Sequence, residues 1–494
     1  MDEYQIRVWW QILNTKKSFP DGFECPFLLS IDADRVTEYV FETPGLSEMR
    51  GASAQLNSLN DLEPILSELG IPNECLVYAA GGSAVIVLPE SKVGFVKDAV
   101  ELAYLEQTGA ATATCVALQV SPVDVQERFG NLVRAAGQQL RAAKGQKSIV
   151  PFFEVLPFSR RCDACRKRPA VVFIAPFEGE AAEGRCRVCQ AKWQLGRNRR
   201  SEWHAILEIG EPPKDLGVIG DVSKGFIGLV YADGNRMGEW IQEANTINEF
   251  RKRSTAVREA VSNALTRTLE IHCVHLPFEV ILVGGDDMLL VTPATVALEV
   301  AASLCRCFTE EMGKYNKTMS AGVILADHHT PVYFLRRLAE QLLKETKRSY
   351  MGASVDFLVL KSQGTRSIID AWESHTFDYP RENLILHHGP YGLAELDQLL
   401  RHVRQGKCVN YPCSQLYGLR DTLKQGRQVS ALAFLYQQAR SSDKIEAFLD
   451  DFANFWSARD RETPPWFLSR SLRGGRVEYR TVWADMADLW DWVE

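Results

Sequence analysis

The sequence predicts an α+β protein with two ferredoxin-like β-α-β-β-α-β domains, a zinc ribbon inserted between them and a helical domain at the C-terminal end. Three observations predict this fold: two similar glycine-containing hairpin sequences, a pair of CxxC motifs between them, and apolar residues at helical spacing late in the chain. In that order along the chain, we expect the four domains at residues 1–150, 151–217, 218–368 and 369–494.

Length and composition limit the class of protein. The chain has 494 residues, 46% of them hydrophobic, which is enough for about three globular units. It has no run of roughly 18 apolar residues and no signal-peptide pattern at its start, so we expect a cytoplasmic protein without a membrane partner. The net charge of -7 argues against a protein whose whole surface coats nucleic acid, although it leaves room for a local basic patch.

The second hairpin carries two adjacent acids in an otherwise apolar stretch, "FEVILVGGDDMLLVTP" at residues 278–293. Apolar, strand-forming runs flank Gly284, Gly285, Asp286 and Asp287, which predicts a tight hairpin in a buried sheet. Neighbouring carboxylates repel each other, and the arrangement makes sense if a divalent cation compensates the charge. Taken alone, the same residues also suit an ordinary type I′ hairpin turn.

A third acid is expected from a neighbouring strand. In "FIGLVYADGNRMGEW", residues 226–240, an apolar run ends in Asp233 and breaks at Gly234 before a helical segment. This pattern offers a metal ligand beside backbone amides that suit phosphate oxygens. We therefore predict that Asp233, Asp286 and Asp287 are catalytic acids that hold two magnesium or manganese ions, activating a 3′-hydroxyl and neutralising a leaving pyrophosphate.

One order of sequence segments occurs twice along the chain. "ECLVYAAGGSAVIVLP" resembles the second hairpin, with Ser83 and Ala84 where the two aspartates stand. Segments before and after it match too, and each copy ends in a helical stretch with a basic cluster, to Lys144 and Lys347 respectively. The matching pairs are 27–36 with 226–237, 74–89 with 278–293, and 112–122 with 318–331. Two copies of one unit are predicted, the first without metal ligands.

Four cysteines are spaced as ligands of one tetrahedral ion: Cys162, Cys165, Cys186 and Cys189. Four thiolates leave zinc no open position for water, so the predicted ion is structural. Two redox dithiols are the alternative. A collar of basic residues surrounds the motifs, and it either holds RNA or DNA phosphates or forms an ordinary solvated surface. The collar consists of Arg160, Arg161, Arg166, Lys167, Arg168, Arg185, Arg187, Lys192, Arg197, Arg199 and Arg200.

These motifs together resemble the palm-domain large subunit of type III CRISPR–Cas effectors, the Cas-ten family, in a short form that lacks the N-terminal HD nuclease domain. The resemblance rests on "YADGNRMG", "GGDD", "SAGVILADHHTP" with "AEQLLKETK", the zinc motifs, and "VTEYVFETPGLSEMRGASAQLNSLN" in the first copy. It implies two palm domains of nucleotidyl cyclase/polymerase type that bind two ATP molecules and join them into cyclic oligoadenylate. Guide RNA, target RNA and other type III subunits are the implied partners.

The resemblance also implies a set of nucleotide-binding residues. Carried over by position, Lys347 meets phosphate, with Lys344 the weaker candidate. The remaining candidates come from the turns of both copies: Gly234, Asn235, Arg236, Gly284, Gly285, Gly81, Gly82 and Ser83. The chain departs from the family pattern after Asp233, where Gly-Asn replaces a second acid, so one metal position is expected to use the Asp233 backbone carbonyl.

The remaining motifs have plain interpretations. The triplet Asp327–His329 lacks the companion acids of a phosphoesterase, and its histidines are expected to orient nearby backbone or substrate. The last 120 or so residues show helical spacing of apolar residues. The final stretch, 482–494, combines tryptophans with acids, which suits either a docking segment or packing on the chain's own helices.

Three functions remain open at the level of sequence. The leading one is an enzyme that makes a cyclic oligonucleotide from ATP. The second is a non-catalytic scaffold that holds RNA or single-stranded DNA through the basic collar. The third is a cyclase of the GGDEF or adenylate type, which makes a mono- or dinucleotide.

Overall fold

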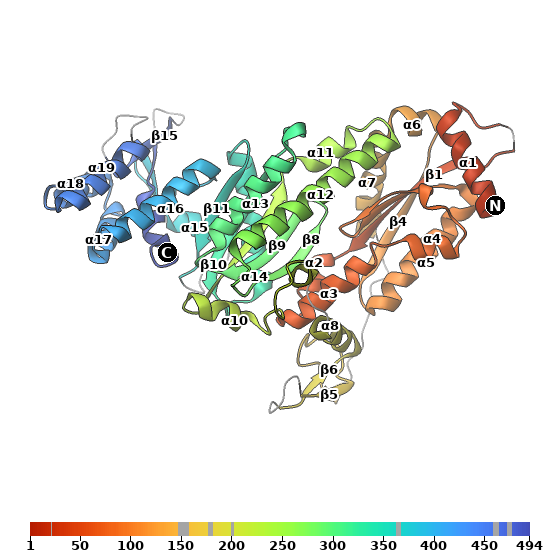
Figure 1. Cartoon of the computed structure of the whole chain (residues 1–494), viewed down its shortest axis with the longest axis horizontal. Coiled ribbons are helices and arrows are strands. Elements are labelled where there is room, and N and C mark those ends of the chain that lie inside the picture. The colour runs from red at the N-terminus through yellow and green to blue at the C-terminus, as the bar shows by residue number, and fades with distance from the viewer. Residues whose placement is uncertain are drawn as a thin grey trace. The chain divides into compact units, whose positions relative to one another are not determined.

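The computed structural model describes residues 1–20, 22–146, 158–175, 181–198, 202–361, 367–457, 464–471 and 477–494. The chain divides into two compact units, each made of several segments. The first comprises Met1–Asp215, Arg236–Thr266 and Glu279–Leu289; the second comprises Leu216–Asn235, Arg267–Phe278 and Leu290–Glu494. Figure 1 labels helices and strands along the chain.

The first unit contains one complete β-α-β-β-α-β domain, the zinc-ribbon segment, and parts of the second copy. Its strands are β1 (Pro26–Asp34), β2 (Leu76–Ala80), β3 (Ser83–Pro89), β4 (Thr112–Gln119), β5 (Val172–Ile174), β6 (Glu183–Arg185) and β8 (Glu279–Gly284). Its helices are α1 (Glu3–Thr15), α2 (Val36–Val40), α3 (Leu46–Ser58), α4 (Glu63–Glu68), α5 (Glu90–Thr108), α6 (Pro122–Glu127), α7 (Phe129–Gln146), α8 (Arg187–Asn198), α9 (Glu202–Ile206), α11 (Met237–Gln242) and most of α12 (Ile247–His272).

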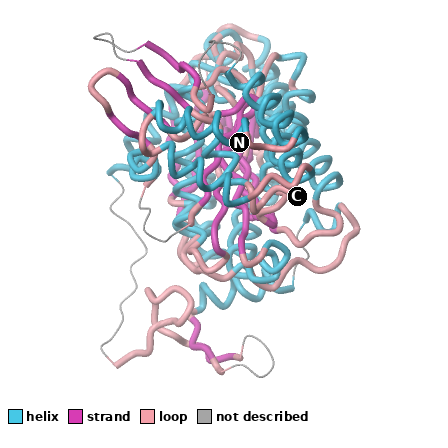
Figure 2. The backbone as a smooth tube through the Cα atoms, turned by 90° about the vertical axis from the view of Figure 1, so that its left-hand side faces the viewer, coloured by secondary structure: helices cyan, strands magenta, loops and turns pink. Residues whose placement is uncertain are grey.

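The sheet of the first domain has the strand order β2-β3-β1-β4. Strand β1 is central and antiparallel to both neighbours, with Leu29 opposite Ile86 on β3 and Ala117 on β4. This order and the connecting helices are those of the ferredoxin-like unit that the sequence predicts. Figure 2 distinguishes the strands of the chain, in magenta, from its helices, in cyan.

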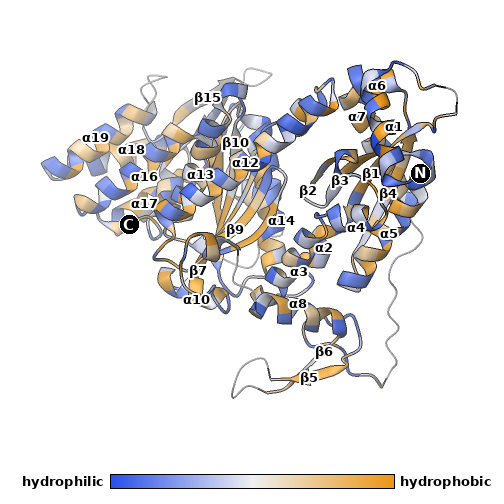
Figure 3. Ribbon diagram, turned by 45° about the vertical axis from the view of Figure 1, so that its right-hand side comes forward, coloured by the Kyte–Doolittle hydropathy of each residue, from blue (hydrophilic) through white to orange (hydrophobic). Residues whose placement is uncertain are grey.

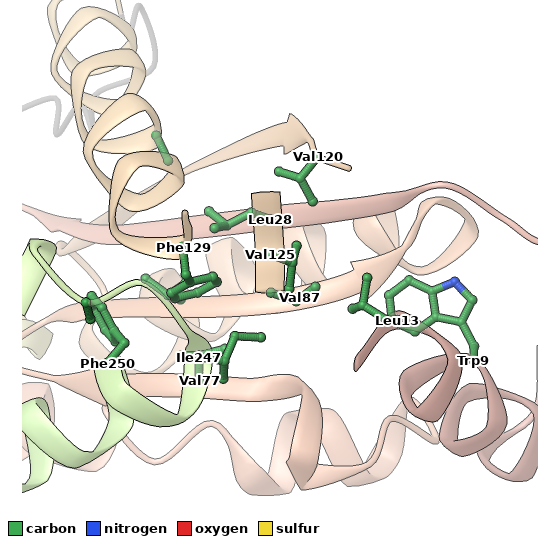
Figure 4. Close-up of a cluster of buried hydrophobic side chains, with 13 residues drawn as sticks. Trp9, Leu13, Leu28, Val77, Val87, Val120, Val125, Phe129, Ile247 and Phe250 are labelled. Atoms are coloured by element: carbon green, nitrogen blue, oxygen red, sulfur yellow. The ribbon is translucent and has the colours of Figure 1, made fainter. Parts of the chain in front are cut away.

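A cluster of buried apolar side chains holds this domain together (Figure 4). Trp9 of α1, Leu28 of β1 and Val87 of β3 belong to it, and Ile247 and Phe250 of α12 join them. The ring of Phe250 meets that of Phe129 edge to face, with 5.5 Å between centroids. Each fully buried side chain of this kind stabilises the fold by about 1.5–3 kcal/mol, so the cluster fixes α12 firmly on the first domain.

The zinc-ribbon helix α8 packs on α3 with almost no space between the two backbones. A Cβ atom on Gly51 would lie 1.8 Å from the carbonyl oxygen of Lys192, and one on Gly196 would lie 1.8 Å from that of Ser47. Both positions therefore require glycine for steric reasons.

The second unit contains the rest of the second copy and the C-terminal region. Its strands are β7 (Phe226–Gly234), β10 (Met319–Asp327), β11 (Ser354–Val359), β12 (Thr376–Asp378), β13 (Glu382–Ile385), β14 (Tyr391–Gly392), β15 (Phe467–Ser471) and β16 (Val477–Arg480), with most of β9 (Asp287–Pro293). Its helices are α10 (Leu216–Gly220), α13 (Ala297–Glu311), α14 (Val332–Ser349), α15 (Ile368–Ser374), α16 (Leu393–Cys408), α17 (Cys413–Leu423), α18 (Arg427–Ala439), α19 (Asp443–Ser457) and α20 (Trp483–Leu489).

The second copy repeats the topology of the first. Its sheet has the order β14-β11-β10-β7-β9-β8, in which the run from β8 to β10 follows the same path as β2-β3-β1-β4. The central strands are strongly hydrophobic, as the orange colour of β9 and β10 in Figure 3 shows. The predicted duplication and the α+β fold class are thus confirmed.

The C-terminal region is mainly helical, as predicted, but it is not purely helical. Besides helices α15 to α20 it holds a sheet of order β12-β13-β16-β15. The strands have three to five residues each, too short for a clear alternation of apolar and polar residues in the sequence. The aromatic residues of the final stretch, Trp483, Trp490 and Trp492, are buried, which favours packing on the chain's own helices over a docking segment.

A buried ionic cluster fastens the C-terminal helix α20 to β11. His387 lies between two carboxylates, 2.8 Å from Asp356 and 2.8 Å from Asp485, and Tyr391 donates a hydrogen bond to Asp485. Burial lowers the pKa of His387, but the two carboxylates outweigh it and raise the value to about 10. The imidazole is therefore a cation at neutral pH, which balances part of the negative charge.

Across the described parts of the chain, no helix combines the length and the hydrophobicity needed to span a bilayer.

Candidate active site

Asp233 stands near the end of β7, where the register sets it opposite Ser320 of β10. Its carboxylate forms an ion pair with Lys347 of α14, with 2.6 Å between Oδ2 and Nζ. The same ammonium donates a hydrogen bond to the carbonyl oxygen of Gly234 at 2.8 Å. Both side chains are about one-third exposed or less. A solvent-facing carboxylate with a lysine beside it is thus present where the sequence predicts it.

The residues after Asp233 form a rigid turn. The Asn235 side-chain nitrogen donates to the hydroxyls of Thr318 and Ser320, at 2.8 and 3.0 Å, and to the carbonyl of Gly352 at 2.9 Å. Its side-chain oxygen is buried and has no hydrogen-bond partner among the described residues. Arg236 adopts a left-handed backbone conformation and pairs with the exposed Glu239 at 2.8 Å.

The GGDD turn is a hairpin, as predicted, between β8 and β9. A Cβ atom on Gly284 would lie 2.7 Å from the Asp287 carboxylate oxygen, so a larger residue would displace that acid. Gly285 has a positive φ of 39°, which favours glycine. The glycines therefore hold the two acids at the tip of the hairpin.

The corresponding turn of the first copy lies directly against it. A Cβ atom on Gly81 would lie 3.0 Å from the backbone nitrogen of Gly285. The turn is itself tied down, because Gly82 donates to the Asn60 side chain at 2.8 Å and accepts from Ala33 at 2.7 Å. Two glycine turns thus meet within the first unit.

A cavity of about 850 Å³ opens beside these turns. It is lined by α3 and the loop after it, β2, α12 and β8, including Asn57, Tyr78, Ser254, Arg258 and Gly285. Burial raises the pKa of Tyr78 to about 12, and the charges of Asp286 and Asp287 act in the same direction, so its hydroxyl stays protonated. Sequence reasoning missed Tyr78 and Arg258, because Tyr78 lies in the strand before the glycine turn of the first hairpin and Arg258 belongs to no recognised motif.

The first copy preserves half of the acid site. Lys144 of α7 contacts Asp32 at 2.8 Å and the Ala33 carbonyl at 2.8 Å, which reproduces the contacts of Lys347. Asp34 accepts 2.8 Å hydrogen bonds from two threonine hydroxyls, as Asn235 donates to two hydroxyls in the second copy. By these contacts Asp32 corresponds to Asp233, whereas the sequence match of 27–36 with 226–237 puts Asp34 in that place.

The structure also shifts the predicted match between the hairpins. Strands β3 and β9 both span seven residues and begin at Ser83 and Asp287. Gly82 and Ser83, not Ser83 and Ala84, thus occupy the places of Asp286 and Asp287. The Ser83 hydroxyl donates to Asp32 at 2.9 Å, so a hydrogen bond stands where the second copy has a further carboxylate.

The described residues contain two groups of potential metal ligands. Within each group, the ligand atoms all lie within 4.8 Å of one another. One is the predicted set of four buried cysteines; the other is Asp327, His328 and His329. Of the three predicted acids, Asp233 belongs to the second unit, and Asp286 and Asp287 belong to the first. In the triplet, His328 is 2.9 Å from the Gly225 carbonyl and His329 is 2.9 Å from Asp327, so both orient nearby groups, as expected.

The four cysteines form a compact set that suits a structural zinc ion. Cys165 and Cys186 lie 3.9 Å apart, and Arg168 reaches both sulfurs at 3.8 and 4.0 Å. Hydrogen bonds from Cys165, Cys186 and Cys189 hold the pKa of Cys162 well below its usual range. Zinc binds cysteine as the thiolate, and the buried guanidinium of Arg168 beside Cys165 and Cys186 favours the charged form of these sulfurs.

The innermost part of the basic collar is not available for phosphate. Arg168 pairs with Glu42 at 2.8 Å, Arg185 with Glu48 at 2.6 Å, and Lys192 with Glu42 at 3.2 Å. All five side chains are buried. These residues balance acidic neighbours, as the second interpretation expects, but they are buried and not solvated, and they dock the ribbon on the first domain. Arg199 and Arg200 lie outside the described residues.

The two lysines predicted to meet phosphate have different contacts in the structure. Lys344 is exposed and pairs with Glu340 of its own helix at 2.8 Å, whereas Lys347 reaches Asp233.

Comparison with known proteins agrees with this geometry. Residues 226–353 match the family model described as Cas10/Cmr2, second palm domain. The chain resembles Cas10. Similar solved structures include a Csm1–Csm4 cassette in complex with cA4 (17% identity, TM-score 0.57, covering 86% of this chain and 65% of that one) and one with cA3 (14%, 0.58, 97% and 71%). Csm1 from T. onnurineus is also similar, with 15% identity and a TM-score of 0.56, over 84% of this chain and 64% of that one.

The Cas10 resemblance at this level of identity concerns the fold. The chain spans less than two thirds of the length of some of these Csm1 chains, 64% in the apo Csm1–Csm4 cassette. No curated protein sequence matches it.

Proposed function

We propose that this chain is a metal-dependent nucleotidyltransferase that joins ATP into a cyclic oligoadenylate as a subunit of a type III CRISPR effector. The observation that carries the proposal is the asymmetry of the duplicated site. Both copies hold an aspartate against a lysine, Asp32 with Lys144 and Asp233 with Lys347, but only the second adds the GGDD turn. An enzyme that joins two like substrates needs two binding sites and one set of catalytic acids.

The acids Asp233, Asp286 and Asp287 would hold magnesium or manganese. Carboxylate oxygens are the donors that these hard cations prefer, and the unpartnered buried oxygen of Asn235 adds a further oxygen next to Asp233. When bound, the ions supply charge neutralisation at the leaving pyrophosphate and a lower pKa for the attacking hydroxyl.

Other side chains bind and orient the nucleotides. Lys347 neutralises Asp233 in the absence of substrate and is within reach of a triphosphate that arrives at the same acid. The cavity beside Gly285 has a volume in the range typical of ligand pockets, and it offers the Tyr78 ring for a base and Arg258 for phosphate. In this proposal the second nucleotide contacts the turn of the first copy, formed by Gly81, Gly82 and Ser83.

Solved relatives support the substrate and the partner class. Csm1–Csm4 cassettes have been crystallised with AMPPNP, with pppApApA and with cA4. We extend to this chain the use of ATP and assembly with other type III subunits. RNA binding is part of the proposal only through that assembly.

The scaffold alternative is less well supported. Its motivation was the basic collar, whose inner members Arg168, Arg185 and Lys192 pair with buried glutamates. A mono- or dinucleotide cyclase shares the acids, and it is distinguished by the length of the product.

A matched pair of variants tests the proposal. Asp233→Asn removes a proposed catalytic acid, and Asp32→Asn changes its counterpart, which has the same lysine contact. We expect the first to reduce oligoadenylate synthesis at least about 100-fold, as loss of a group that stabilises the transition state does, and to weaken manganese binding. The second should keep synthesis within about tenfold, since the GGDD acids remain intact. Equal losses in both variants would contradict the assignment.

A further inference from the structure

Arg50 of α3 makes a set of buried contacts that the proposed reaction does not use directly. Its guanidinium forms a two-pronged ion pair with Glu279, with Nε 3.0 Å from one carboxylate oxygen and a terminal nitrogen in contact with the other. The exposed fractions of the two side chains are 8% and 1%. The residues are 229 positions apart in the sequence, so the pair joins distant parts of the first unit.

The remaining donors of Arg50 reach the zinc-ribbon region. They contact the carbonyl oxygens of Gly196, at 3.0 Å, and of Pro213, at 3.1 Å. Gly196 lies on α8, the helix that also carries Cys189, and α8 is locked to α3 at Gly51. Arg50 therefore connects the helix of the zinc ribbon with Glu279 through a single side chain.

Glu279 is the first residue of β8, the strand that leads into the GGDD turn. Among the described strands, β8 lies at the edge of its sheet and pairs on one side only. An edge strand has fewer ladder hydrogen bonds to fix it, so its position depends on side-chain anchors. Burial raises the pKa of Glu279, and Arg50 opposes that shift, which means that the carboxylate needs Arg50 to stay charged.

We propose that Arg50 and Glu279 are positioning residues that transmit the folded, zinc-bound state of the ribbon to the GGDD hairpin. The ribbon fixes α8, α8 and α3 fix Arg50, and Arg50 fixes the start of β8 and so the acids at its other end. The effect on turnover rests on the proposed function; the coupling between zinc and hairpin does not.

Glu279→Gln is the most informative variant. The cavity is lined by Val280 and Ile281 but not by Glu279, so the change leaves the nucleotide pocket intact while it removes the ion pair. Arg50 lines the cavity itself, and for that reason Arg50→Lys serves only as a supporting variant. Arg306→Gln, which breaks an exposed ion pair with Asp397 in the second unit, is the control.

The first readout is hydrogen–deuterium exchange of the full chain, followed by mass spectrometry of a peptide covering 279–289. Zinc removal with a chelator should raise exchange there at least tenfold in the wild type. Glu279→Gln with zinc bound should show the same rise, and chelation should add little to it, because two perturbations of one connection are not additive. Unchanged exchange in Glu279→Gln, or additive effects, would overturn the proposal.

Global unfolding is recognised by exchange in β10, residues 319–327, which belongs to the second unit. If chelation also raises exchange in β10, the chelation result is set aside and the zinc-bound Glu279→Gln variant alone tests the proposal. We expect this variant to raise exchange in 279–289 and to leave exchange in β10 unchanged.

The second readout is steady-state synthesis from ATP. We expect Glu279→Gln to lower kcat about tenfold or more with KM for ATP within twofold of the wild type, and Arg306→Gln to change neither. A rise in KM at constant kcat would assign the pair to substrate binding and overturn the positioning role. If the wild type makes no product while hairpin exchange responds as described, the proposed function fails and the coupling stands.

Discussion

Gly51→Ala should release the zinc ribbon from the first domain. The new Cβ atom would lie 1.8 Å from the Lys192 carbonyl oxygen, whereas a carbon–oxygen contact needs about 3.3 Å. Because the obstructing atom belongs to the backbone of α8, the helices must move apart by about 1.5 Å. Overpacking of this kind costs about 1–3 kcal/mol.

The separation also strains the ion pairs that cross the same interface. Arg185–Glu48 and Lys192–Glu42 are both buried, and breaking such a pair costs about 3–5 kcal/mol. Overpacking together with the loss of one such pair would destabilise ribbon docking in Gly51→Ala by about 4–8 kcal/mol. Gly94→Ala is the matched control, since Gly94 lies within α5 with no atom near its Cβ position. Alanine there should stabilise the helix by about 0.5–1 kcal/mol.

The assay is the rate of zinc release to a chromogenic chelator, together with urea unfolding followed by circular dichroism. Gly51→Ala should release zinc at least tenfold faster than the wild type, and Gly94→Ala at the wild-type rate. If both variants behaved alike, the close packing of α3 on α8 would be refuted.

Three further predictions concern other contacts. His387 has a folded pKa of about 10 against an ordinary 6.5, so its stabilisation is fully present below about pH 6.5 and is lost as pH rises through 10. Urea unfolding should show the wild type losing about 3–5 kcal/mol more than His387→Gln between pH 6.5 and 10.5; parallel losses would contradict the charged state. Lys347→Met should lower synthesis at least about tenfold while Lys144→Met lowers it less, and the reverse ranking would exclude Lys347 from the reacting site. Ser83→Ala should change KM for ATP a few-fold without changing kcat, and an unchanged KM would indicate that the first copy does not hold a nucleotide.

The sequence predicts best what depends on local patterns. The spacing of Cys162, Cys165, Cys186 and Cys189 predicts their cluster, because two CxxC motifs at this distance can place four thiols around one tetrahedral ion. The GGDD turn and the duplication are likewise visible, since apolar runs and turn residues recur at similar intervals.

Long-range pairing explains most of what the sequence could not predict. Arg168 and Lys192 look like free surface cations until the fold brings Glu42 to them from 126 and 150 positions away. Asp32 is revealed as a counterpart of Asp233 only by its contact with Lys144. The sequence comparison placed Ser83 opposite Asp286 because it aligned the glycine pairs of the two hairpins. In the structure the strands after the turns begin at Ser83 and Asp287, so Ser83 is equivalent to Asp287.

Mass spectrometry of the products made from ATP tests the central claim most directly. The purified chain is incubated with ATP and manganese, with and without RNA and type III partner subunits. The account predicts cyclic oligoadenylates from the wild type and none from the variant that combines Asp286→Asn with Asp287→Asn. The same products from that variant, or no product from the wild type with every partner present, would contradict it.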